Sequence, residues 1–399
     1  MRRLIYIFII GLLLCSYTWA DGSRYASKSL LSEGKWVKIR VDKTGIYKLS
    51  YADLKNMGFS DPSKVSVHGY GGWPLDEDFS KEYIDDVPST PVWRGSDYLL
   101  FYGKGPVKWE YDSSSQTFVH TNNPYSLYGY YFVTDATPTN DMTSVAQASG
   151  ATNRITTYDD YLVHEQELVS LAKSGRELYG EDFSGATPRT LSTFSSIPGI
   201  TNEDAKVTMS FVSKVTSGTG VASLSINQSN VLDVSIRSTR EEYVKALEGV
   251  STAVWKGEKS EKNSVVVSYN SASHNNVRLN YVRLHFKRTL QLYGAYTFFR
   301  SIASIGNVSR FVVQGANANT LVFDVTDAQR VRLMETELNG SELTFSIPAG
   351  TLREFVLVRT DQSFISPEVV GEVENQNLHA LEQKDMIIIA AKAFQTQAE

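Results

Sequence analysis

Val-Arg-Leu-Asn-Tyr-Val-Arg-Leu-His-Phe, at residues 277–286, is the stretch that decides the fold class. Val277, Leu279, Tyr281, Arg283 and His285 would face one side of an extended strand, and the residues between them would face the other. Such alternation over ten residues, with valine and aromatic side chains, is typical of a strand and not of a helix. The chain around it is therefore predicted to be mostly β.

Short strands at regular spacing are expected on both sides of this stretch. They are predicted at 207–212, 222–226, 231–236, 265–269, 311–313, 321–325, 343–347 and 355–358. Gly, Ser and Asn turns separate them, which is typical of an antiparallel β-sandwich or jelly roll. We therefore expect residues 190–360 to form a β-sandwich domain and 361–382 to form a linker.

The preceding part of the chain, residues 21–185, is predicted to be a β-rich α+β domain. Its first hairpin is expected at 36–49, with Asp42-Lys-Thr-Gly as the turn. A short helix should follow, with Ser50 as its N-cap and Gly58 as its C-terminal stop.

Two further segments of this domain carry clear patterns. Residues 107–111 and 117–120 are expected to pair as a second hairpin. Residues 158–179 are the best helical stretch of the chain, although Gly175 interrupts the pattern.

The two ends of the chain differ from the rest. Residues 1–20 combine Arg2 and Arg3, an apolar run and Thr-Trp-Ala, which predicts a cleaved secretory signal peptide. Residues 386–391 read Met-Ile-Ile-Ile-Ala-Ala, a continuous apolar run typical of a strand in a buried parallel sheet. We therefore expect 383–399 to be the start of an α/β domain that this sequence truncates.

Composition excludes several classes of function. The net charge of −5 becomes −7 without Arg2 and Arg3, and no block of Lys or Arg is present, so a nucleic-acid partner is not expected. No membrane span is expected once the signal is cleaved. Cys15 is the single cysteine and lies in the signal, so the mature chain has no thiol nucleophile and no thiolate metal site.

Candidate site residues are few, and each has a plain structural interpretation. The six histidines lack the spacing of a zinc site; they are His68, His120, His164, His274, His285 and His379. Gly69-Tyr-Gly-Gly lacks the Lys-Ser/Thr of a phosphate loop, so we expect these glycines to allow an unusual backbone under packed aromatics.

Two other features leave alternatives open. The acidic loop 76–86, with Asp76, Glu77, Asp78, Asp85 and Asp86, is either solvated or a calcium site. Aromatic residues make up 12% of the chain and either fill cores or bind carbohydrate. No Gly-x-Ser-x-Gly elbow is present. We therefore predict no catalytic, cofactor-binding or metal-binding residue and no cofactor.

Several stretches together resemble a known family. They are residues 37–49, 67–73, 100–106, 120–125, 164–165, 174–178 and 279–283. In this order they resemble the N-terminal region of the PorU-type sortases of the type IX secretion system, which are gingipain-related cysteine peptidases. Residues 385–390 and 393–395 resemble the opening of the caspase-like catalytic domain of that family.

The resemblance implies a non-catalytic part of an exported, surface-associated or periplasmic peptidase. The catalytic His and Cys of the family come later, so no residue here inherits either role, and the chain alone should be inactive. The resemblance implies that the parent protein removes C-terminal sorting signals from cargo and links the cargo to lipopolysaccharide. Its partners would be its own catalytic domain and outer-membrane components of the secretion system. The alternative is a complete secreted β-sandwich protein that binds a ligand such as a glycan.

Overall fold

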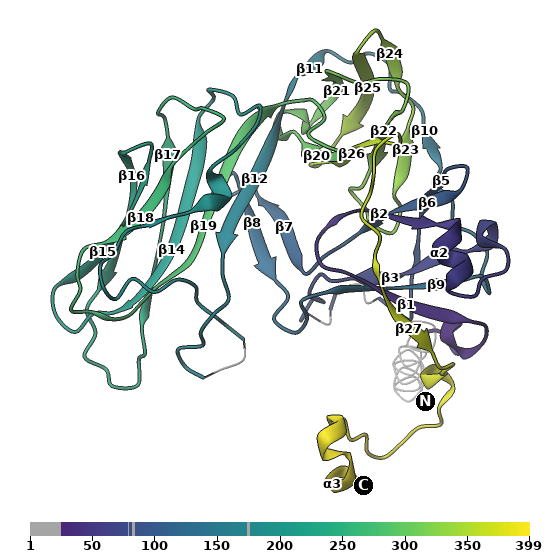
Figure 1. The fold of residues 1–399 in the computed structure, drawn as a ribbon, viewed down its shortest axis with the longest axis horizontal. Helices are drawn as coiled ribbons and strands as arrows, with labels where there is room; N and C mark the ends of the chain where they lie inside the picture. Colours follow the sequence, from purple (N-terminus) through teal and green to yellow (C-terminus); the bar gives the residue numbers. More distant parts are fainter. Residues whose placement is uncertain (1–24, 79, 82–83, 174–175) are drawn as a thin grey trace, which may run out of the picture.

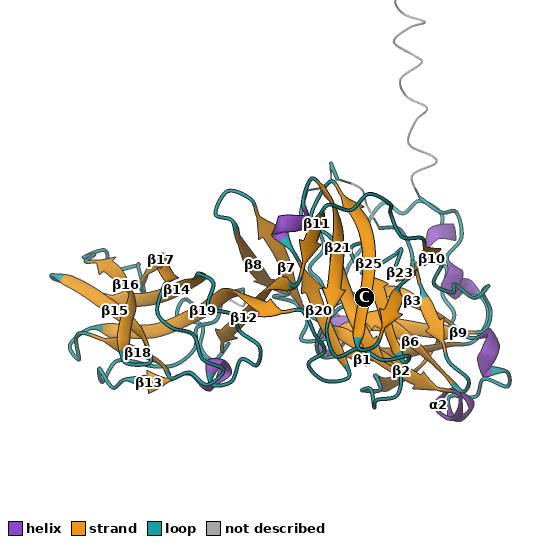
Figure 2. Cartoon of the chain, turned by 90° about the horizontal axis from the view of Figure 1, so that it is seen from above, coloured by secondary structure: helices purple, strands orange, loops and turns teal. Residues whose placement is uncertain are grey.

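The computed structural model describes residues 25–78, 80–81, 84–173 and 176–399, and it confirms a mostly β fold. The predicted signal peptide lies outside the described residues. Figure 1 shows a β-sandwich lobe on the left and a larger β-rich block on the right, joined by a narrow waist. Figure 2 shows the same division from above.

The N-terminal sheets occupy the lower right of Figure 1. One sheet has the strand order β27 (Glu368–Val373), β1 (Trp36–Val41), β9 (Gly129–Thr134), β3 (Ser66–Gly71) and β4 (Ser89–Thr90). The other contains β2 (Gly45–Ser50), β6 (Tyr98–Gly103) and β5 (Val92–Arg94). Apolar side chains of the two sheets, such as Ile39 and Phe101, pack into one core.

The predicted hairpin at 36–49 is wrong, although both of its strands exist. β1 pairs with β9 and β27, whereas β2 pairs with β6 in the other sheet. Both strands bury side chains on two faces, so the turn at 42–44 crosses between the two layers instead of closing a ladder.

The short helix that follows is confirmed. It is α2 (Tyr51–Asn56), and Ser50 Oγ accepts a hydrogen bond from the backbone N–H of Asp53 at 3.0 Å. Gly58 lies just beyond its end with a φ of 91°, a conformation that glycine adopts without strain.

A nine-stranded sheet runs through both lobes. Its order is β10 (Ser144–Val145), β23 (Arg332–Met334), β22 (Thr320–Asp324), β26 (Glu354–Arg359), β20 (Tyr296–Arg300), β12 (Thr157–Glu165), β19 (Asn275–Thr289), β14 (Ala205–Lys214) and β17 (Leu247–Trp255). β12 and β20 share one residue pair, Asp159 with Arg300. The sheet is therefore narrowest at this point, which forms the waist.

Each half of this sheet packs on a smaller sheet. In the left lobe the cover is β13 (Arg189–Thr190), β18 (Val265–Tyr269), β15 (Thr219–Ile226) and β16 (Ser229–Arg237). In the right block it is β11 (Asn153–Ile155), β21 (Asn307–Val313), β25 (Glu342–Ala349) and β24 (Glu337–Asn339). The strand predicted at 277–286 is confirmed as part of β19, but its uninterrupted alternation is wrong. The register between β19 and β14 shifts at Asn280, so Val277 and Leu279 share the core of the left lobe with Val282, Leu284 and Phe286. Each of the other strands predicted between 207 and 358 lies within a strand of these sheets, apart from the last residue of 321–325.

The predicted helix at 158–179 is wrong. Its first part is β12, which pairs with β19 over nine consecutive residue pairs. The Thr, Tyr and Val residues of β12 favour a strand, and antiparallel pairing with β19 fixes it.

The second predicted hairpin is confirmed as β7 (Val107–Asp112) and β8 (Thr117–Asn122). It forms a separate two-stranded sheet beside β12 (Figure 1). The remaining helical turns are short: η1 (Leu30–Ser32), η2 (Pro62–Lys64), η3 (Ser192–Phe194), η4 (Ile302–Ser304), η5 (Leu378–Ala380), η6 (Lys392–Phe394) and α3 (Gln395–Ala398).

The last segment of the chain extends away from the sheets (Figure 1). β27 lies within the predicted linker 361–382 and pairs with β1. Residues 386–391 lie outside the strands, and Met386 and Ile389 are 75% and 95% exposed. No helix in the described part of the chain is long and apolar enough to cross a membrane.

Candidate functional site

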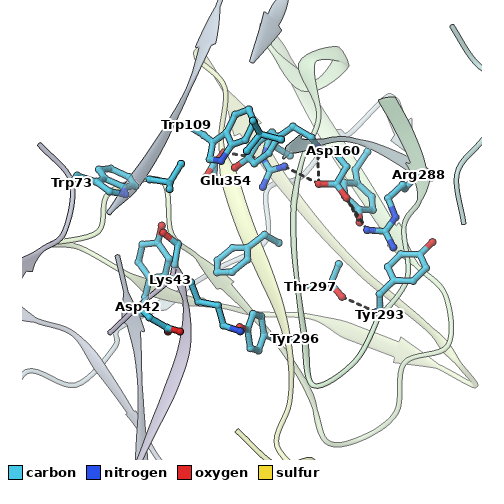
Figure 3. Close-up of a pocket in the computed structure, with 18 residues that line it drawn as sticks. Asp42, Lys43, Trp73, Trp109, Asp160, Arg288, Tyr293, Tyr296, Thr297 and Glu354 are labelled. Carbon is cyan, nitrogen blue, oxygen red and sulfur yellow. Dashed lines mark hydrogen bonds and ion pairs between the residues drawn. The ribbon is translucent and has the colours of Figure 1, made fainter. Parts of the chain in front are cut away.

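A cavity of about 440 Å³ lies at the waist (Figure 3). The turn 42–44, Trp73, β6 and β7 line it from the N-terminal side, and β12, β19, β20 and β26 line it from the nine-stranded sheet. Its position follows from the layering, because the three-stranded sheet packs on β22 and β26 through residues such as Leu100 and Val356.

Four of the charged groups of the cavity are paired with one another, and Asp42 and Lys43 complete its charged lining. Arg300 is 1% exposed, and its Nε lies 2.8 Å from a carboxylate oxygen of Glu354. Asp160 lies 2.7 Å from Arg288 and 3.6 Å from Arg300. Burial alone would lower the pKa of Arg300, but Tyr161, Glu354 and Asp160 together raise it. The guanidinium therefore stays charged, and two arginines balance two carboxylates.

Aromatic rings form most of the remaining wall. The rings of Trp109 and Tyr161 stack with their centroids 4.0 Å apart. The guanidinium of Arg300 lies 4.3 Å from the centre of the Tyr161 ring, and that of Arg288 lies 3.7 Å from the Tyr293 ring. These contacts hold the arginines over ring faces, where cation–π attraction offsets part of their lost hydration.

Three phenol hydroxyls in the cavity have no hydrogen-bond partner within the part of the chain that the structure describes. They belong to Tyr102, Tyr161 and Tyr296. Tyr102 is 2% exposed, and burial raises its pKa well above the usual value, as Glu354 and Tyr161 also do. The indole N–H of Trp73 is also buried without a partner among the described residues. The cavity thus has polar groups available for a bound molecule.

The glycine motif at 69–72 lies beside this cavity and packs around Lys104. Gly69 and Gly71 have φ values of 135° and 87°. A Cβ at Gly71 would lie 2.8 Å from the Cβ of Lys104. The ammonium of Lys104 lies 3.9 Å from the Tyr70 ring, and burial lowers the pKa of Lys104 to about 8. The expected role, an unusual backbone under packed aromatics, is confirmed.

The histidines lie in separate contacts. His120 on β8 is 2.8 Å from Glu165 on β12, and Arg283 approaches the other ring nitrogen of His120 at 3.3 Å. Arginine can only donate, so Nδ1 of His120 accepts and its Nε2–H donates to Glu165. The other five lie as follows: His164 against Glu181, His285 against Asp159, His274 against Tyr269, His68 against Thr137 and His379 near Asp85.

The acidic loop uses its carboxylates in contacts with the protein. Asp76 pairs with Lys81 at 2.6 Å, and Glu77 pairs with Arg176 at 2.8 Å. Asp86 accepts from the hydroxyl of Ser29 at 2.7 Å. Among the described residues, no group of three or more His, Cys, Asp or Glu side chains is arranged to hold a metal ion.

Sequence reasoning did not find the waist cavity. Its residues come from positions 42–44, 73, 102–109, 158–163, 288–300 and 354, which are far apart along the chain. The available signal was the high aromatic content, and composition does not predict which aromatic rings contact one another.

The chain is similar in fold and sequence to a solved structure. The crystal structure of dimeric latent PorU from Porphyromonas gingivalis matches 94% of this chain, with a TM-score of 0.87 and 31% sequence identity. The match covers 36% of the PorU chain, so this chain spans about a third of that protein's length. No family model and no curated protein matches the chain. The predicted resemblance to a PorU-type N-terminal region is confirmed.

Proposed function

We propose that this chain is the non-catalytic N-terminal region of an exported cysteine peptidase of the type IX secretion system. Its role is to carry and position a peptidase domain that follows residue 385. The observation that carries this proposal is the similarity to PorU over 94% of the chain at 31% identity. Removal of C-terminal sorting signals from cargo would then be the activity of the whole protein, at the cell surface or in the periplasm.

The chemistry of the chain supports a positioning role. A cysteine peptidase needs a thiolate nucleophile. Beyond the predicted signal peptide the sequence contains no cysteine. The peptidase activity must therefore come from residues other than those of 21–399.

The path of the C-terminal segment also supports positioning. Glu368 on β27 forms a two-point ion pair with Arg40 on β1, with N–O distances of 2.6 and 2.9 Å. Further along, the side-chain amide of Asn375 donates to the carbonyls of Leu31 and Gly34 at 3.0 and 2.9 Å. A domain that begins after residue 385 would therefore start from an anchored segment and not from a free tether.

The test compares two purified proteins in a peptide-cleavage assay with a C-terminal sorting-signal peptide. Residues 21–399 should be inactive. The same region followed by the downstream coding sequence of its gene should cleave the peptide, and iodoacetamide should abolish the cleavage. Cleavage by clean 21–399 would refute the proposal, and so would a gene whose downstream sequence encodes no Cys and His.

An anchoring variant tests the positioning role within the extended protein. Arg40→Gln combined with Asn375→Ala should release the segment from the N-terminal sheet and lower the rate of cleavage. Arg330→Gln, at an 84% exposed side chain that pairs with Asp327 and lies outside β27, is the matched control.

A further inference from the structure

We propose that the cavity at the waist is a saccharide-binding site that takes a neutral pyranose ring. The proposal concerns residues between the lobes and does not depend on the peptidase role of the parent protein. It follows from three properties of the cavity: unpartnered hydroxyls, closed ion pairs and aromatic walls.

The unpartnered hydroxyls favour a polar occupant. A buried tyrosine hydroxyl usually finds a hydrogen-bond partner. Tyr102 is buried and Tyr161 is half-buried, and neither hydroxyl has a partner among the described residues. Both rings line the cavity next to the Arg300–Glu354 pair. Each hydroxyl can donate one hydrogen bond and accept another. A molecule with several hydroxyl groups matches this set better than an apolar one.

The ion pairs of the cavity, whose charged groups already bind each other, favour a neutral occupant. Arg300 and Arg288 are already paired with Glu354 and Asp160 at 2.7–2.8 Å. The other two charged lining residues, Asp42 and Lys43, have opposite signs, so the charges of the lining cancel. An anionic ligand would have to compete with a carboxylate, and a cationic ligand with a guanidinium, at a buried position where breaking a pair is costly. The carboxylate oxygen of Glu354 that is not bonded to Arg300 can still accept from a sugar hydroxyl.

The aromatic walls match the apolar faces of a sugar ring. Figure 3 shows Trp73 at the left and Trp109 at the upper centre of the view, with Asp160 and Arg288 to the right of Trp109. Pyranose rings expose flat patches of C–H groups beside their hydroxyls, which suits a site made of ring faces and fixed polar groups. The volume of about 440 Å³ lies within the roughly 300–1,000 Å³ of small-molecule sites.

The test uses saturation-transfer NMR and tryptophan fluorescence on the purified chain. The probes are the methyl pyranosides of glucose, galactose and mannose and N-acetylglucosamine, each titrated to millimolar concentration. At least one should bind, and it should quench tryptophan emission. Acetate and methylammonium, as small charged probes, should not compete.

Two substitutions localise the binding. Tyr102→Phe with Tyr161→Phe removes two unpartnered hydroxyls and keeps both rings, so the fold should survive with an unchanged melting midpoint. Saccharide affinity should fall at least tenfold. Tyr243→Phe is the control, because Tyr243 is 91% exposed and does not line this cavity.

Two results would overturn the proposal. One is the absence of binding by all four saccharides at millimolar concentration, which would mean that the cavity holds water only. The other is binding that the double Tyr→Phe variant leaves unchanged, which would place the sugar elsewhere. Neither result bears on the peptide-cleavage assay, so the two proposals fail independently.

Discussion

Replacing Arg300 with methionine should loosen the waist between the two lobes. Arg300 is 1% exposed and contributes the single residue pair between β12 and β20. Its side chain also donates to the carbonyl of Asp159 at 3.1 Å and pairs with Glu354 at 2.8 Å. Methionine keeps most of the volume but removes all of these polar contacts.

The expected cost follows from what is left unpaired. Removing one partner of a buried ion pair typically costs about 3–5 kcal/mol. Asp160 would keep Arg288 at 2.7 Å, and the side chain of Glu354 is 28% exposed and can be partly hydrated. We therefore expect the lower end of that range, about 3 kcal/mol.

The assay is a double-mutant cycle in urea with Arg300→Met, Glu354→Gln and the double variant. Replacing both partners removes the unpaired carboxylate, so the double variant should recover about 1–2 kcal/mol relative to the sum of the singles. Amide hydrogen exchange in β20 and β12 should rise in Arg300→Met and fall back in the double variant.

Two outcomes would refute this account of the waist. A cost below about 1 kcal/mol for Arg300→Met would mean that the pair contributes no more than a surface ion pair. Additive effects of the two substitutions would mean that Arg300 and Glu354 do not interact in solution. Arg330→Met, at an 84% exposed side chain, is the control for loss of an arginine as such.

Three further predictions concern the N-terminal sheets and the tail. Burial lowers the pKa of Lys104 to about 8 from 10.5, so the unfolded chain binds more protons between these values and the free energy of unfolding should rise as pH increases from 8 to 10.5. Lys104→Met should abolish this rise. At pH 7 it should increase the free energy of unfolding by about 1 kcal/mol, because the gain from removing a buried charge exceeds the loss of about 2 kcal/mol of cation–π attraction. An unchanged pH profile in urea melts would contradict this prediction. Gly129→Ala should cost about 1–3 kcal/mol, because its Cβ would lie 2.1 Å from the carbonyl oxygen of Lys104, whereas Gly350→Ala meets no atom within 4 Å and should be neutral. Deleting 383–399 should change the free energy of unfolding by less than about 0.5 kcal/mol, because its apolar side chains are exposed; a larger loss would show that the tail packs on the fold.

Local sequence patterns predicted the elements that depend on contacts between residues close in sequence or on regular alternation. The capping of α2 by Ser50 and the β7–β8 hairpin depend on residues within a few positions of each other. β15 and β16 alternate because each has one face on the core of the left lobe.

Patterns failed where distant pairing decides the structure. β12 contains Tyr158, Tyr161 and Val163, residue types that favour strands, and β19 pairs with it across more than 100 positions. β27 looks like linker sequence, with a burial pattern that is mostly exposed, and it is a strand because β1 offers an edge. The division into the predicted domains stays a prediction, which limited proteolysis near 185–200 would test.

The waist differs in kind from the cores that it joins. The apolar clusters of the left lobe and the upper right block contain Phe211 and Phe299 respectively, and each cluster stays on its own side. Contacts at the waist are polar or aromatic instead: Arg300 with Glu354, Trp109 stacked on Tyr161 and His120 with Glu165.

Apolar burial is tolerant of orientation, whereas paired charges and stacked rings require one geometry. We therefore expect the polar contacts at the waist to constrain the angle between the lobes. A saccharide that hydrogen-bonds to Tyr102 on the N-terminal side and to Tyr161 on β12 would strengthen the same geometry. Binding at the waist should then slow hydrogen exchange in β7, β12 and β20 together, while the exchange in β15 and β16 of the distant lobe stays unchanged.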